Sequence, residues 1–93
     1  MAALVLRSVK VNKRIALVSA FPDRLIIVDR EGTRSIPIAD LARITHKSGV
    51  KTGRIGIVTV DNEEIVIRGL RANETPTAYQ VLVRLALAAQ NGD

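Results

Sequence analysis

Apolar and polar residues alternate along most of this chain, and the alternation gives way to a helical pattern near its end. Between Leu4 and Arg68 the period is two, and turn residues interrupt it about every eight to twelve positions. From Pro76 to Gln90 the period changes to about 3.6 residues. This order predicts a mainly β fold with one C-terminal α-helix, in which the helix caps a small closed or nearly closed antiparallel sheet.

The alternation predicts seven strands. They span residues 3–10, 15–20, 25–29, 34–38, 42–47, 53–60 and 63–68, and the helix spans roughly 75–91. A helical turn or a bend is expected at 40–42, and Gly32 suits a hairpin turn because it can adopt positive φ. Pro37 lacks an amide donor, which favours an edge or a strand end. In the last strand pair the inward residues are Ile55, Ile57, Ile65 and Ile67, and the outward ones include Arg54, Glu64 and Arg68.

The expected helix has a marked start and one clear apolar stripe. Asn73 or Thr75 can serve as the N-cap, and Pro76 suits the first turn. Asn91 and Gly92 tolerate the left-handed geometry that often ends a helix. The stripe that faces the sheet comprises Ala78, Leu82, Leu85 and Ala89, flanked by Val81 and Ala88.

A second group of apolar residues widens the helix surface beyond the usual sheet-facing stripe. It comprises Tyr79, Val83, Ala86 and Leu87. One interpretation is that Ala86 is neutral and that Val83 and Leu87 are isolated surface residues, which are common. The other is that Tyr79, Val83 and Leu87 form an interface with another subunit, because contiguous exposed apolar patches often mark interaction sites.

The composition fits a single domain, residues 1–93, that works in the cytoplasm. The length suits one core, and 47% of the residues are hydrophobic although only Phe21 and Tyr79 are aromatic. The chain has no cysteine, which excludes disulfides and thiolate metal sites and favours an intracellular protein. The short apolar start does not fit a signal peptide, and no run approaches the ~18 apolar residues of a membrane span.

The order of strands and helix resembles the pleckstrin-homology-like (PH-like) superfamily. The matching pattern reads Leu-Ile-Ile-Val at 25–28, a turn at Gly32, Ile-Pro-Ile at 36–38, Asp-Leu-x-x-Ile at 40–44, and the strands at 53–57 and 65–67. Eukaryotic members usually carry a Trp in the helix, and this chain has none, so it is more similar to the bacterial or GRAM-like branch. A Src-homology-3-like or an Sm-like barrel is an alternative on strand count, although the Sm-like helix precedes its strands.

The resemblance implies a binding module, because domains of this superfamily mostly bind phosphoinositides, peptides or other proteins. In the phosphoinositide binders, the loop between the first two strands presents a Lys followed by a Lys/Arg-x-Arg spacing. The equivalent stretch here holds Lys10, Lys13 and Arg14, but Ala16 stands where a second Arg is needed. The lipid function is therefore not carried over from this loop.

The densest positive segment lies instead at residues 46–54, which contain no acid. Lys47, Lys51 and Arg54 could face a phosphate there, and Ser48 and Thr52 could donate hydroxyl bonds. These three cations are the candidate residues for an alternative function, a peripheral membrane module that binds anionic lipid headgroups. The plainer interpretation is a solvated hairpin loop, and the net charge of +5 also fits ordinary solubility.

No catalytic, metal or cofactor site is expected. His46 is the only histidine, and the acids Asp61, Glu63 and Glu64 fit a solvated turn better than a divalent-ion site. Two aromatic residues offer little stacking surface, which disfavours nucleic acid as a partner. The function expected from the sequence is therefore noncatalytic protein–protein contact, with self-association into a homo-oligomer as one form of it.

Overall fold

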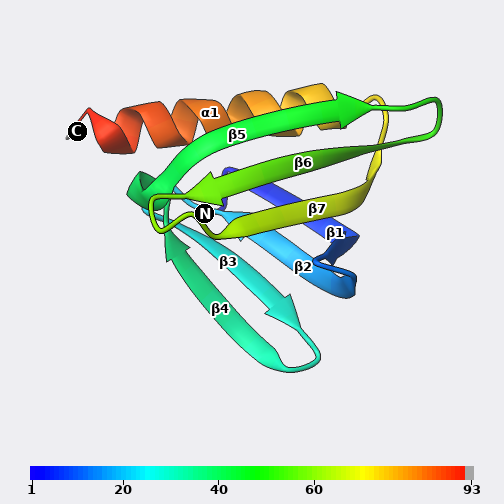
Figure 1. Cartoon of the computed structure of the whole chain (residues 1–93), viewed down its shortest axis with the longest axis horizontal. Coiled ribbons are helices and arrows are strands. Elements are labelled where there is room, and N and C mark those ends of the chain that lie inside the picture. Colours follow the sequence, from blue (N-terminus) through cyan, green and yellow to red (C-terminus); the bar gives the residue numbers. More distant parts are fainter. Residues whose placement is uncertain (92–93) are drawn as a thin grey trace.

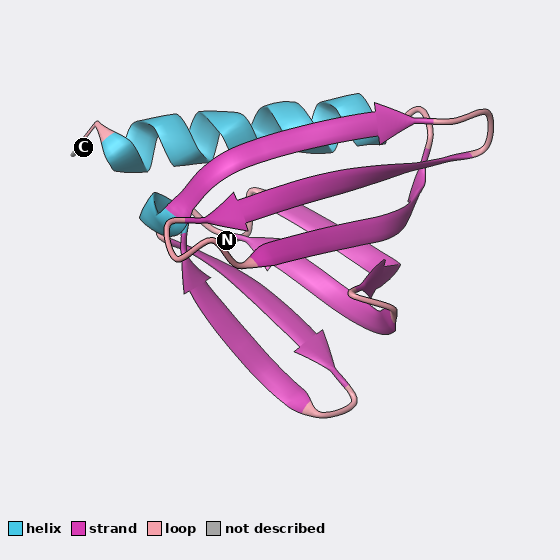
Figure 2. Ribbon diagram, in the orientation of Figure 1, coloured by secondary structure: helices cyan, strands magenta, loops and turns pink. Residues whose placement is uncertain are grey.

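The computed structural model describes residues 1–91, which form seven strands, a 3₁₀ turn and one long helix (Figure 1, Figure 2). The elements are β1 (Leu4–Val11), β2 (Arg14–Ala20), β3 (Arg24–Asp29), β4 (Gly32–Pro37), η1 (Ile38–Asp40), β5 (Leu41–Ser48), β6 (Thr52–Thr59), β7 (Glu64–Arg71) and α1 (Thr75–Gln90). Neighbouring strands are antiparallel in one sheet of order β4-β3-β2-β1-β7-β6-β5. The expected mainly β fold with a C-terminal helix is confirmed.

The sheet curls into a half-barrel whose two edge strands do not pair with each other. Figure 1 shows β3 and β4 turning away from the layer of β5 to β7, while α1 runs alongside β5. Within residues 1–91, β4 pairs only with β3, and β5 pairs only with β6. The half-barrel is therefore open between β4 and β5, and the arrangement is compatible with a PH-like fold.

Two irregularities in neighbouring strands lie where the sheet turns. Ser8 in β1 adopts φ 55° between the register pairs of Leu6 and Val9, and Gly69 in β7 adopts φ 86°. The register of β6 with β7 also shifts beside Gly69. A bulge bends its strand and increases the local twist, so the two bulges turn the sheet between β1 and β7. These strands accordingly share only two register pairs.

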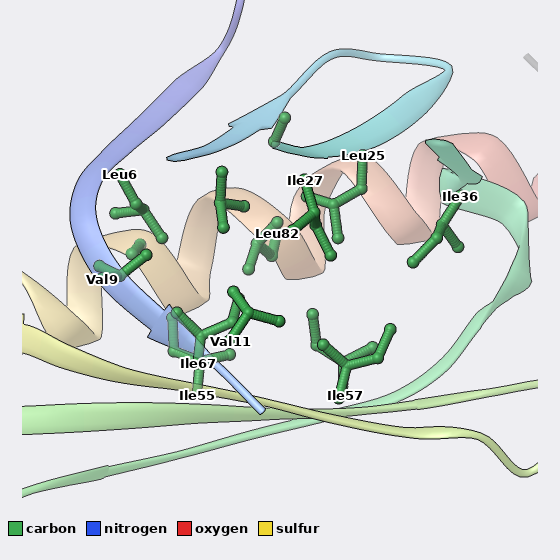
Figure 3. Packing of buried hydrophobic residues seen from close by; sticks show 14 of the residues in the cluster. Leu6, Val9, Val11, Leu25, Ile27, Ile36, Ile55, Ile57, Ile67 and Leu82 are labelled. Atoms are coloured by element: carbon green, nitrogen blue, oxygen red, sulfur yellow. The ribbon is translucent and has the colours of Figure 1, made fainter. Parts of the chain in front are cut away.

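The interior of the half-barrel is one cluster of aliphatic side chains that come from every strand and from α1 (Figure 3). The inward residues expected for the last strand pair are all fully buried, namely Ile55, Ile57, Ile65 and Ile67. Arg54, Glu64 and Arg68 are exposed, as expected. Leu82 of α1 is also fully buried and lies between the two halves of the sheet in Figure 3.

The strand bounds differ by up to three residues from those that the sequence pattern predicts, and two of the differences have a clear structural cause. β7 continues three residues beyond Arg68, because the extra residue Gly69 lets Leu70 return to the core, where it is buried. The helical turn expected at 40–42 lies earlier, at Ile38–Asp40, directly after Pro37. Pro37 ends β4, in agreement with its missing amide donor, and Gly32 adopts the expected positive φ.

The start of α1 is built differently from the expected cap. Glu74 occupies the N-cap position, and no side chain caps the first turn. Thr75 is instead fully buried, and its hydroxyl donates to the carbonyl oxygen of Arg71 at 2.9 Å. Asn73 is exposed, and Pro76 lies in the first turn as predicted. At the other end Asn91 has φ −82°, so it is not left-handed, and Gly92 lies outside the described residues.

The helix is also rotated relative to the expected stripe. Its buried residues are Thr75, Ala78, Leu82 and Ala86, whereas Leu85 and Ala89 are only half-buried against the core. Ala86 was expected on the outer side, but it packs inward because α1 leans toward β5 and η1. This rotation places the rest of the outer apolar group beside the edge of β5.

Gly53 of β6 lies against Thr75 at the start of α1, so a substitution at Gly53 tests how closely the helix packs on the sheet. A Cβ atom at Gly53 would lie 2.1 Å from Thr75 Oγ1 and 2.8 Å from its Cβ. Gly53→Ala should therefore lower the free energy of unfolding by about 1–3 kcal/mol in urea denaturation. Gly49→Ala, whose Cβ would meet its nearest atom at 3.2 Å, is the matched control and should cost clearly less. Equal stability of the two variants would contradict the close packing.

Candidate functional site

A shallow apolar groove runs between α1 and the edge strand β5. Its volume is about 210 Å³, and it is lined by Leu41, Ala42, Ile44, Tyr79, Val83, Ala86, Leu87 and Gln90. Tyr79, Val83 and Ile44 are half-buried, and Leu87 keeps 55% of its surface exposed. All three interface candidates from the sequence, Tyr79, Val83 and Leu87, therefore line one groove together with residues of β5.

Two contacts between α1 and β5 mark the ends of the groove. Near the end of the helix, Gln90 Nε2 donates to the carbonyl oxygen of Leu41 at 3.0 Å. Near its start, the rings of Tyr79 and His46 are 4.3 Å apart at an interplanar angle of 40°. The span of β5 from 41 to 46 corresponds to roughly 16 Å at about 3.3 Å per residue. The groove is thus long enough for about five residues of an extended segment.

The strand that forms one wall of the groove also has an unpaired edge. Among residues 1–91, β5 hydrogen-bonds in the sheet only to β6. In an antiparallel strand, alternate residues direct their N–H and C=O groups away from the paired neighbour. Such an edge can accept another extended strand. Beyond Leu41, whose carbonyl oxygen accepts from Gln90, the wall therefore combines apolar side chains with a strand edge that no other strand pairs among residues 1–91.

The candidate cations of the basic segment lie on the outer face of the sheet and at the tip of the β5–β6 hairpin. Lys47 and Arg54 are opposite each other in the β5–β6 register. The same row continues to Arg68 in β7 and Lys10 in β1. Lys51 lies in the turn at the hairpin tip, next to Val50, which is 98% exposed.

Carboxylates do not neutralise this row of four cations. None of Lys10, Lys47, Arg54 and Arg68 belongs to an ion pair among residues 1–91. Glu64 lines a hollow on this face together with three of the four cations, Lys47, Arg54 and Arg68, but forms no ion pair with them. Unpaired cations on adjacent strands repel one another, so the row attracts anions.

The other residues that the sequence singled out are used differently. The guanidinium of Arg34 donates to the Glu63 carboxylate, and this bond lowers the pKa of Glu63. Because the carboxylate already pairs with Arg34, it is a poor ligand for a metal ion. Arg14 forms an ion pair with Glu31. No group of three or more acidic, histidine or cysteine side chains within residues 1–91 is placed to hold a metal ion.

Sequence reasoning did not find the β5 side of the groove or the extent of the cation row. Ala42 and Ile44 look like ordinary strand residues, and their role depends on where the helix docks. Arg68 joins Arg54 only through the register of β6 with β7, which the bulge at Gly69 shifts. The sequence signals were the apolar width of the helix for the groove and the shared outward face of Arg54 and Arg68 for the row.

A comparison with protein-family models finds none that matches the chain, and a comparison with curated proteins finds no significant similarity. In the part of the chain that the structure describes, no helix is long and apolar enough to span a membrane.

The ring contact at the end of the groove can be tested by proton NMR. His46 is the only histidine, so its imidazole signals need no further assignment. The face of Tyr79 should shift these signals upfield, and Tyr79→Leu should return them toward the values of an exposed histidine. Phe21→Leu is the control, because it changes the only other aromatic ring. Imidazole signals that do not respond to Tyr79→Leu would contradict the stacking.

Proposed function

We propose that this chain is a noncatalytic binding module of PH-like fold that acts through protein–protein contact. In this proposal the groove between α1 and β5 receives an extended segment of a partner protein. The observation that carries it is that an unpaired strand edge lies beside the half-buried side chains of Tyr79 and Val83 and the exposed side chain of Leu87. The partner is another protein or a second copy of this chain.

Strand addition explains why the unpaired edge of β5 and the apolar side chains of α1 lie side by side. Backbone hydrogen bonds along β5 supply affinity without regard to sequence, and pockets for alternate side chains supply selectivity. Residues i and i+2 of an added strand point to the same side, which here is the apolar floor of Ala42, Ile44 and Val83. An apolar surface of this kind beside an open edge is otherwise an aggregation hazard, which a bound segment removes.

The proposal does not include catalysis. The single histidine, His46, makes its ring contact with Tyr79 at the end of the groove rather than with a nucleophile. The groove is walled by aliphatic side chains, the ring of Tyr79 and the amide of Gln90, which can hold a peptide but include no carboxylate or imidazole to act as a general base.

Selection of a random nine-residue peptide display library against the protein tests this function. Peptides enriched on the wild type should bind Val83→Asp at least tenfold more weakly, because the change places a charge on the apolar floor. Thr77→Asp, an exposed position on the other side of α1, is the matched control and should bind like the wild type.

N-methylation of alternate residues in an enriched peptide should also abolish binding, since it removes the donors of strand pairing. Sedimentation of the protein alone shows whether a second copy supplies the segment. In that case Val83→Asp becomes monomeric at concentrations where the wild type is not. A library that yields no binder sensitive to Val83→Asp, together with a wild type that stays monomeric, would overturn the proposal.

A second candidate function is attachment to anionic membranes, and the tip of the β5–β6 hairpin favours it. Val50 is 98% exposed at the tip, with Lys47, Lys51 and Arg54 close behind it. An apolar tip with a basic collar can enter the headgroup region while the cations contact the phosphates.

Co-sedimentation with vesicles that contain anionic lipid tests the membrane candidate. Each basic residue near such a surface contributes about 1 kcal/mol, so Lys47→Glu/Lys51→Glu should weaken binding by at least about thirtyfold. The double change Arg7→Glu/Arg30→Glu alters the net charge equally at exposed positions away from the hairpin and serves as the control. Absence of binding at low salt, or equal losses in both variants, would remove this candidate.

A further inference from the structure

The two elements that form the groove carry no acidic residue. Residues 41–60, which include β5 and β6, and residues 75–90 of α1 contain no Asp or Glu. The chain as a whole has nine acids, so their absence from both walls leaves the surroundings of the groove positive.

Each of the two elements carries an exposed cation next in sequence to a residue that lines the groove. Arg43 lies on β5 between the lining residues Ala42 and Ile44, and it is exposed. Arg84 follows Val83 on α1 and is also exposed. Neither arginine takes part in an ion pair among residues 1–91.

The outer face of β5 is defined by its pairing with β6. Arg43, Thr45 and Lys47 stand opposite Val58, Gly56 and Arg54 respectively. Ile44 and His46 instead stand opposite the buried residues Ile57 and Ile55, so they belong to the inner face. A strand added to β5 would therefore place alternate residues beside Arg43 and Lys47 and the remaining residues over the apolar groove.

Among residues 1–91, an acid precedes each of the two elements that form the groove. Glu74 precedes α1 and is 3.9 Å from Arg71 in an exposed ion pair. Asp40 precedes β5 and is half-buried, and its carbonyl oxygen accepts a bond from the Val60 amide. Glu64 on the outer face belongs to β7, two strands away from the edge. Within residues 1–91, the charged side chains that β5 and α1 themselves carry are thus all basic.

We infer that the groove selects an acidic extended segment, in which Asp or Glu alternates with apolar residues. The inference rests on the proposed function, because it names the partner chemistry of the same site. Apolar side chains at positions i, i+2 and i+4 enter the groove, and carboxylates at i+1 and i+5 lie beside Arg43 and Lys47, with i+3 beside Thr45. Opposite charges on neighbouring strands stabilise the pairing, whereas a basic segment would be repelled.

The experiment is the peptide display selection repeated with the charge-reversed variant Arg43→Glu/Lys47→Glu. The wild type should enrich Asp and Glu at alternate positions, and the reversed variant should enrich Lys and Arg at the same positions. A synthetic acidic peptide from the wild-type selection should bind the reversed variant at least about tenfold more weakly. The same peptide should bind the control Arg7→Glu/Arg30→Glu within about threefold of the wild type.

The outcomes separate this inference from the function on which it rests. Groove-dependent peptides without a charge preference, or with basic residues, would overturn the inference and leave the proposed function standing. Absence of any peptide or second copy that depends on Val83 would overturn both. Acidic peptides whose binding is insensitive to Arg43→Glu/Lys47→Glu would also overturn the inference. The preference for acidic residues would then come from other basic residues of the protein.

Discussion

The packing of α1 across the open side of the curled sheet is the interaction on which the rest of the structure depends. A sheet that does not close leaves part of its core uncovered, and Ala78, Leu82 and Ala86 cover that part from the helix. The helix must lie close to the sheet to do so, and Gly53 of β6 lets the start of α1 approach because it has no side chain that would meet Thr75. The same packing sets the remaining apolar residues of α1 beside an unpaired strand edge.

Closing the core and creating the groove are therefore two results of one arrangement. If β4 and β5 paired, the edge would disappear. If α1 lay flat with its predicted stripe inward, Ala86 would face outward and Tyr79 would not reach His46. The observed rotation buries Ala86 and leaves Tyr79 and Val83 half-buried, next to Ile44.

The alternation of apolar residues was enough to predict the fold class and the strands to within a few residues. It also identified the inward isoleucines, because a period of two assigns each residue to one face. It could not predict the bulges at Ser8 and Gly69, since these residues interrupt the alternation without changing the kinds of residue around them, or the register shift between Leu41 and Arg43 in β5. The N-cap was also wrong, because Thr75 packs in the core and its hydroxyl bonds to a carbonyl instead of an amide.

The candidate site was predictable only in part. The apolar width of the helix pointed to Tyr79, Val83 and Leu87, and the charge pattern pointed to Lys47, Lys51 and Arg54. Their relation in space depends on register and docking, which bring β5 into both surfaces: its inner side and edge border the groove, and Lys47 on its outer side begins the row of cations. A ligand in the groove therefore lies next to the row of cations.

Amide hydrogen exchange is the most direct test of strand addition at β5, with the free protein compared with a saturated complex of a peptide that depends on Val83. Strand addition predicts slower exchange at those β5 amides that point away from β6, and no change along the edge of β4. Protection confined to β4, or unaltered exchange along both edges, would contradict it.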